Sequence, residues 1–132
     1  MQTEPKGAPA RAIMDSPIKA TALRAGFDLY QEGAVSFAKY KPFMRTWYPA
    51  LKLNGEAGEV AEKVGKAFRD NDGIFDMQRR QDIAKEIGDV LWYCAAVARD
   101  LGLSLGDCAI GNFTKLIDRA DRDVLGGSGD NR

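Results

Sequence analysis

Two pairs of acidic residues are the part of this chain best suited to chemistry. Glu56 and Glu59 form the first pair, and Glu86 and Asp89 form the second. Residues three apart on an α-helix are neighbours on its surface, so each pair would present two carboxylates side by side. One such pair alone is usually a solvated helix face, but two antiparallel helices could bring all four acids together. Oxygen-only clusters suit Mg²⁺ or Mn²⁺, which commonly act on phosphates.

The composition excludes several other kinds of site. The 132 residues include 19 Lys and Arg, 19 Asp and Glu, and no histidine. The balanced charge provides no overall basic field for a nucleic-acid polymer. Without histidine, the chain cannot form histidine-based triads, zinc sites that need imidazole, or the Glu-x-x-His motifs of ferritin-like di-iron bundles. Cys94 and Cys108 have no CxxC spacing, and we expect two small buried thiols in a reducing cytosol.

The length fits one domain with an arm and a tail. Residues 1–25, which contain three prolines, are expected to be a partly irregular and mostly extended arm that allows a short helix around residues 19–24. Residues 26–125 form the expected catalytic domain, and residues 126–132 form a glycine-rich tail. No run of eighteen apolar residues and no secretory signal pattern is present. We therefore expect no membrane partner and a cytoplasmic location.

Helical periodicity runs through the chain. It predicts helices over residues 28–39, 50–69, 78–101 and 104–124, with Ser104 as the N-cap of the last. With no strand pattern between them, these helices predict an all-α bundle of four to five helices. The expected inward-facing residues include Ala57 and Val64 on the second helix, then Ile87, Leu91 and Leu101 on the third, and Leu105 and Leu116 on the fourth.

A polar stripe borders the apolar face of three of these helices. The stripes hold the four acids on the second and third helices, and Asn112, Lys115 and Arg119 on the fourth. Packing the apolar faces together would bring the stripes to a shared groove. Divalent ions would relieve the repulsion between the carboxylates, and the cations would neutralise charge on a leaving pyrophosphate. The groove has the composition of a nucleoside triphosphate site.

Three segments of the chain resemble one family. The runs over residues 53–63, 86–93 and 112–116 contain the acid pairs, Gly-Asp-Val-Leu-Trp-Tyr and Asn-x-x-Lys-Leu. In that order and spacing they resemble the MazG-like branch of the all-α nucleoside triphosphate pyrophosphohydrolases, in its compact single-domain phage and bacterial form. The resemblance covers about residues 28–132. Many members read Glu-Glu-x-x-Glu at the first element, whereas Gly55 stands here in place of the first acid, which puts a third metal position in question.

The resemblance implies hydrolysis between the α and β phosphates of a nucleoside triphosphate, with Mg²⁺ or Mn²⁺. Glu56, Glu59, Glu86 and Asp89 would be the metal ligands, and Glu56 or Glu59 would orient or deprotonate the attacking water. Asn112 would contact the sugar or base, with Lys115 and Arg119 on the phosphates. The remaining substrate-binding candidates are Lys63 and Lys66, which could equally be ordinary salt-bridging residues, and Trp47, which could stack on the base.

The resemblance also implies a homodimer or homotetramer that adjusts deoxynucleotide pools, with deoxyguanosine triphosphate slightly favoured as substrate. Two alternatives stay open. One is a pyrophosphohydrolase acting on a phosphoribosyl nucleotide, and the other is a non-catalytic helical module that binds a nucleotide or a partner protein. Metal-dependent turnover separates an enzyme from a binding module.

Overall fold

The computed structural model describes residues 4–126, and every element among them is helical. The order is α1 (Ala8–Met14), α2 (Pro17–Val35), the 3₁₀ helix η1 (Pro42–Met44), α3 (Trp47–Asn71), α4 (Met77–Asp100) and α5 (Leu105–Asp121). The predicted all-α class is confirmed. The predicted glycine-rich tail lies, apart from Gly126, outside the described residues. The chain divides into two compact units, Tyr30–Leu103 and the combination of Met1–Leu29 with Ser104–Arg132.

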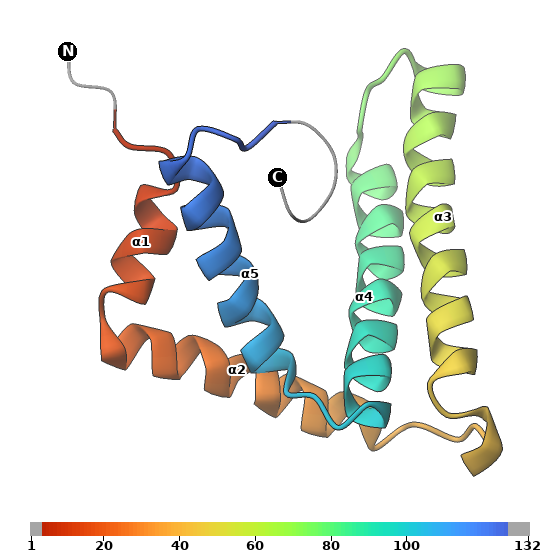
Figure 1. Ribbon diagram of the computed structural model, residues 1–132. Coiled ribbons are helices and arrows are strands. Elements are labelled where there is room, and N and C mark those ends of the chain that lie inside the picture. The colour runs from red at the N-terminus through yellow and green to blue at the C-terminus, as the bar shows by residue number, and fades with distance from the viewer. Residues whose placement is uncertain (1–3, 127–132) are drawn as a thin grey trace. The chain divides into compact units, whose positions relative to one another are not determined.

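The first unit is built on the antiparallel pair α3 and α4, which lie side by side (Figure 1). The chain reverses between them at Asp72 and Gly73, both in the left-handed region with φ of 50° and 74°. A Cβ on Gly73 would also lie 2.8 Å from the Phe68 ring, so glycine is required there. Asp76 then caps α4 by accepting a hydrogen bond from the Arg79 amide.

The end of α2 is fixed against α4 within the same unit. The buried Gln31 amide donates to the carbonyls of Ala95 (3.3 Å) and Leu103 (3.0 Å). The Trp92 indole N–H donates to the carbonyl of Ala34 at 2.8 Å. The small buried residues Ala34, Ala67, Ala95, Ala96 and Ala98 fill the interior, which lets the helix backbones approach closely.

In the second unit, the arm is more helical than the sequence predicted. The expected helix at residues 19–24 is confirmed as part of α2, but the mostly extended reading of the arm is wrong, because α1 also forms. Pro9 and Pro17 occupy the first turns of α1 and α2, where a missing N–H costs no hydrogen bond. Arg11 on α1 binds Asp121 on α5 at 2.7 Å.

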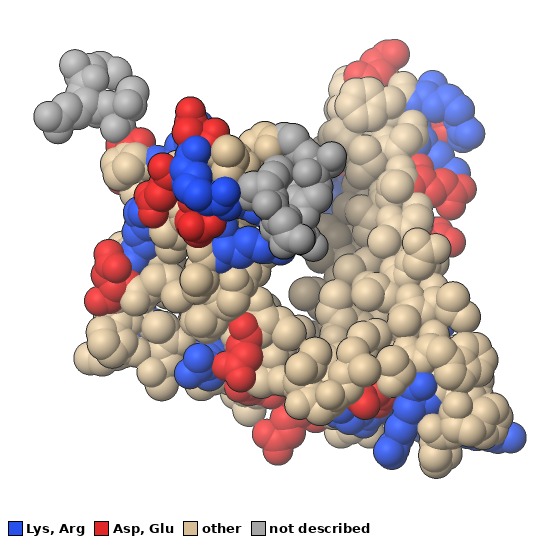
Figure 2. Space-filling model, viewed as in Figure 1, with Lys and Arg blue, Asp and Glu red and all other residues tan. Residues whose placement is uncertain are grey.

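Several predicted core positions are exposed in the single chain. Ile87 is 47% exposed, Leu91 41%, Leu101 54% and Leu116 39%, and Ala57 is exposed as well. Figure 2 shows that the face of the α3–α4 hairpin turned to the viewer carries few charged side chains. The periodicity located the apolar faces, but the described helices cover only part of each.

The two cysteines differ from each other in exposure. Cys94 is half-buried and Cys108 is exposed, and neither forms a disulfide bond within residues 4–126. The expectation of two buried thiols is therefore wrong for Cys108, which lies on α5 beside the half-buried Ala109 and Ile110 but outside the apolar face. No helix in the described part of the chain is both long enough and apolar enough to span a bilayer.

Candidate metal centre

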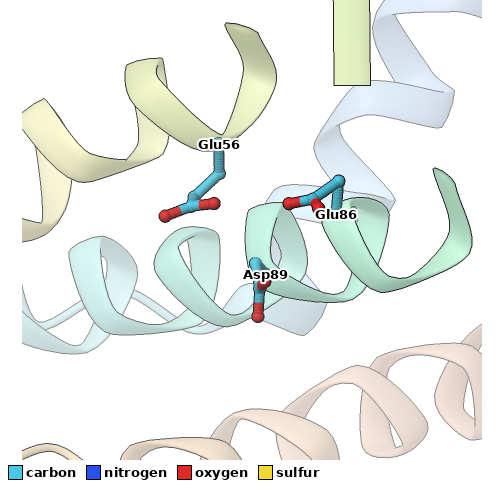
Figure 3. A group of neighbouring side chains, drawn as sticks. All are labelled: Glu56, Glu86 and Asp89. Carbon is cyan, nitrogen blue, oxygen red and sulfur yellow. The ribbon is translucent and has the colours of Figure 1, made fainter. Parts of the chain in front are cut away.

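Three of the four predicted acids meet between α3 and α4. Glu56 from α3 and Glu86 and Asp89 from α4 each place a carboxylate oxygen within 4.8 Å of the others (Figure 3). The Glu56 and Glu86 side chains are only 15% and 17% exposed, whereas Asp89 is exposed. Three carboxylates without a nitrogen or sulfur donor match the ligands that Mg²⁺ and Mn²⁺ prefer. We call these three residues the acid trio.

Glu59 is exposed and is not a member of this trio. An α-helix turns about 100° per residue, so Glu59 points about 60° away from Glu56 around α3. Lys63, seven residues after Glu56, points within about 20° of it. Lys63 therefore lies closer than Glu59 to the line along α3 on which Glu56 stands. Its predicted role as a ligand or base stays a prediction.

Two lysines partly offset the negative charge of the acid trio. The ammonium of Lys63 lies 3.1 Å from Glu86, and that of Lys52 lies 3.1 Å from Glu56. The hydrogen bond to Glu86 raises the pKa of Lys63, and the hydrogen bond to Glu56 raises the pKa of Lys52. Both lysines therefore stay charged at neutral pH. Lys63 was among the predicted site residues, and Lys52 was not.

Two hollows lie along the α3–α4 hairpin: one is lined by members of the trio, and the other is linked to the trio through the Lys63–Glu86 ion pair. The aromatic hollow, about 450 Å³, is lined by two members of the trio and by three aromatic rings: Phe37, Glu56, Asp89, Trp92 and Tyr93. The basic hollow, about 400 Å³, is lined by three cations with neighbouring polar groups: Lys63, Lys66, Arg79, Gln78, Asp70 and Asp82. Lys66 itself pairs with Glu62 at 2.6 Å. Both predicted lysines of α3 thus belong to the basic hollow.

The aromatic rings next to the trio were not among the predicted site residues. Tyr93 lies on α4, and its ring stands edge-to-face to Trp92 at 4.9 Å and 86°. Burial raises the pKa of the Tyr93 hydroxyl, so the ring stays neutral. Trp47, the predicted stacking residue, begins α3 with its indole N–H bound to the Phe43 carbonyl at 3.1 Å. The sequence did contain a signal for this ring: Tyr93 follows Asp89 by four residues, which places both on the same face of a helix.

A buried carboxylate fixes the loop that leads into α3. The Asp100 side chain is fully buried and accepts hydrogen bonds from the Thr46 amide and the Tyr40 hydroxyl, each at 2.8 Å, and from Arg99 at 2.7 Å. Burial alone would raise the pKa of Asp100, but these three hydrogen bonds lower it below its usual range. The network thereby holds the start of α3, the helix that carries Lys52 and Glu56.

The predicted substrate residues of the fourth helix lie in the other unit. Asn112 and Lys115 are exposed on α5, and Arg119 is buried there with 5% exposure. The shared groove that would join them to the acids stays a prediction.

Comparison with known proteins identifies the family. The MazG nucleotide pyrophosphohydrolase domain matches residues 49–123, a segment that contains the acid trio, most of α3 and all of α4 and α5. The chain is also 47% identical over 85 residues to the Gene 37 protein of Mycobacterium phage L5, across 64% of this chain and 75% of that protein. No solved structure gave a significant match. The chain belongs to the MazG nucleotide pyrophosphohydrolase family, which confirms the resemblance seen in the sequence.

Proposed function

We propose that this protein hydrolyses a nucleoside triphosphate between its α and β phosphates and releases the monophosphate and pyrophosphate. The observation that carries the proposal is the acid trio, whose oxygens lie within 4.8 Å of one another inside the segment that the family match covers. Hydrolysis of nucleotide anhydrides is the activity for which the family is named. We further propose residues 26–125 as the catalytic domain.

Glu56, Glu86 and Asp89 would hold Mg²⁺ or Mn²⁺, with Glu59 as a further ligand. When bound, the ion would neutralise phosphate charge and make a bound water more acidic. Glu56 and Glu59 are the carboxylates that we assign to orienting the attacking water and accepting its proton. The low exposure of Glu56 keeps bulk water away from that carboxylate and strengthens its interactions.

The cations of the chain would bind the phosphates. Lys63 is already in contact with the trio through Glu86, so it can move onto a phosphate oxygen once a divalent ion takes over the neutralisation of that acid. Lys66 extends the same line of positive charge. On α5, we assign Lys115 and Arg119 to the phosphates and Asn112 to the sugar or base, with Trp47 as a stacking residue.

We propose that the substrate is a deoxynucleotide, with deoxyguanosine triphosphate favoured, and that the protein adjusts deoxynucleotide pools in the cytoplasm, or in the host cytoplasm if phage-encoded. We also propose a homodimer or homotetramer. Large apolar side chains such as Phe68 (65% exposed) and Met77 (76%) remain in water in the single chain. Exposed apolar surface of this kind is typical of protein interfaces. Covering it with a second copy would remove these side chains from water.

The direct test is pyrophosphate release across the eight common nucleoside triphosphates, with Mg²⁺ and Mn²⁺ in separate series. We expect divalent-dependent release with at least one deoxynucleotide, and its loss in Asp89→Asn without loss of helical structure. A phosphoribosyl nucleotide in the same panel tests the rival substrate class. Full activity in Asp89→Asn, or no release with any nucleotide, would refute the proposal.

A further inference from the structure

The two hollows beside the acid trio have opposite chemistry. The aromatic hollow contains three rings and no lysine or arginine among its lining residues. The basic hollow contains three cations and two carboxylates, and no aromatic ring among its lining residues. Both volumes, about 450 and 400 Å³, fall in the range of small-molecule sites. A nucleoside triphosphate has the same two-part character, with a flat base at one end and an anionic chain at the other.

We infer that the substrate lies along the α3–α4 hairpin, with its nucleoside in the aromatic hollow and its β and γ phosphates toward the basic hollow. This inference rests on the proposed function and goes beyond it by assigning a direction. It adds Phe37 and Tyr93 as residues that contact the nucleoside and Arg79 as a residue that contacts the leaving pyrophosphate.

The order of contacts along the hairpin places the trio between the two hollows. At one end Lys52 lies over the Tyr93 ring, 5.9 Å from its centroid. In the middle Glu56 meets Glu86 and Asp89. Next along α3, Lys63 pairs with Glu86. Seven residues of helix separate Glu56 from Lys63, a rise of about 10 Å, so a phosphate chain whose α-phosphate lies at the trio would extend toward the basic hollow.

The aromatic rings of this hollow are placed so that a flat ring could stack on them. Trp92 is held by its hydrogen bond to the Ala34 carbonyl and cannot turn freely. Tyr93 stands edge-to-face against it. Phe37 is 75% exposed at this hollow, so its ring has a free face. Because every nucleobase offers a π-face, such rings form stacking platforms.

The reverse orientation would direct the β and γ phosphates toward a third hollow, away from Lys63. Lys39 and Lys41 line a hollow on the other side of Tyr93, together with Tyr40 and Tyr48. That hollow has no member of the acid trio among its lining residues, whereas Lys63 in the basic hollow contacts Glu86 directly. Phosphates that extend from the trio therefore meet Lys63 before any other lining cation of the three hollows.

Binding of the two product-like probes tests the direction. Isothermal titration calorimetry in Mg²⁺ would measure the dissociation constants of inorganic pyrophosphate and of each of the four deoxynucleoside monophosphates. Arg79→Gln is expected to weaken pyrophosphate about fivefold and leave the monophosphates unchanged. Phe37→Leu is expected to weaken the monophosphates about fivefold and leave pyrophosphate unchanged.

Matched controls come from neighbours that line neither hollow. Arg80→Gln removes the same charge one residue later, and Phe43→Leu removes an exposed ring (73% exposed) from the same loop region. Both controls should leave both dissociation constants unchanged. Circular dichroism should show the same helical content in all four variants.

The outcomes separate this inference from the proposed function. An exchanged pattern, in which Phe37→Leu weakens pyrophosphate and Arg79→Gln weakens the monophosphates, refutes the direction. The direction is also refuted if the wild-type chain releases pyrophosphate from triphosphates while neither variant differs from its control in binding either probe. It is refuted as well if the wild-type chain binds neither probe. A wild-type chain that binds both probes with the expected pattern but hydrolyses no triphosphate refutes the proposed hydrolysis and leaves the two subsites supported.

Discussion

Replacing Asp100 by asparagine tests how the loop before α3 is held. Thr46 has φ 67° and ψ −60°, and the Trp47 amide donates to the Arg45 carbonyl at 2.8 Å. This is the classic γ-turn geometry, which is rare and strained. The strain is offset by the Asp100 carboxylate, which accepts from the Thr46 amide at 2.8 Å. Asp100→Asn should therefore loosen the start of α3.

The size of the effect follows from the partners of Asp100. The side chain is fully buried, and the two further donors are the Tyr40 hydroxyl and the Arg99 guanidinium. An asparagine amide keeps one oxygen but turns two N–H groups toward a site that is already rich in donors. Losing a buried, charge-assisted network of this kind costs about 3 kcal/mol. At this chain length that lowers Tm by roughly 10 °C.

Thermal unfolding followed by circular dichroism at fixed protein concentration measures the change in Tm caused by Asp100→Asn. The matched control is Asp118→Asn, which removes an exposed carboxylate paired with Arg122 on α5. That pair is open to solvent, so the control should change stability by no more than about 0.5 kcal/mol. If Asp100→Asn and Asp118→Asn shift Tm equally, the loop is not held by the buried carboxylate and the reasoning is wrong.

Three further outcomes are expected. Ser104→Ala should cost about 1 kcal/mol in urea unfolding, because the Ser104 hydroxyl caps α5 and binds Asp28 at 2.7 Å; an unchanged midpoint would contradict the cap. Hydrogen bonds, first from the Ser104 hydroxyl and then from the Gly106 amide, lower the pKa of Asp28. The pKa of Asp100 is lowered as well, by the hydrogen bonds described above. The two ionised carboxylates therefore stabilise the fold above about pH 4, and this stabilisation should be lost as the pH falls through their lowered native pKa values. A free energy of unfolding that rises on acidification would contradict this expectation. Lys115→Ala should weaken triphosphate binding more than monophosphate binding in calorimetry, and equal losses would place the lysine away from the β and γ phosphates.

The middle of the fold could be predicted from the sequence because its periodicity is strong. The predicted limits 78–101 differ from α4 by one residue at each end, and Ser104 is the N-cap of α5 as expected. Sequence signals within a helix gave the wrong helix end where contacts with residues far away in the sequence determine that end. α3 begins at Trp47 rather than residue 50 because Asp100, far away in the sequence, fixes the turn at Thr46.

The end of α2 shows the same limitation. The helix was expected to reach residue 39 but ends at Val35. Its last carbonyls find other partners there, since the Ser36 hydroxyl donates to Gly33 at 2.6 Å and the Trp92 indole donates to Ala34. The serine is a local signal, but the tryptophan lies on another helix. No reading of residues 28–39 alone could include it.

The sequence predicted the kind of site, an acidic metal centre, but it did not predict which of the acids come together. Acids at a spacing of three located both helices of the centre, and three of the four acids meet. Which three depends on how α3 is rotated toward α4, and that is set by packing between the helices. Lys52 and Arg79 escaped notice for a related reason, because their importance comes from neighbours on the opposite helix or in the hollow.

The central claim is that the acid trio binds a divalent cation. Calorimetric titration of Mn²⁺ into the wild-type chain, Glu86→Gln and the exposed control Glu32→Gln tests it most directly. We predict one binding event in the wild type, a loss of affinity of at least about tenfold in Glu86→Gln, and no change in Glu32→Gln. Equal Mn²⁺ affinity in all three proteins, or no binding in the wild type, would contradict the account.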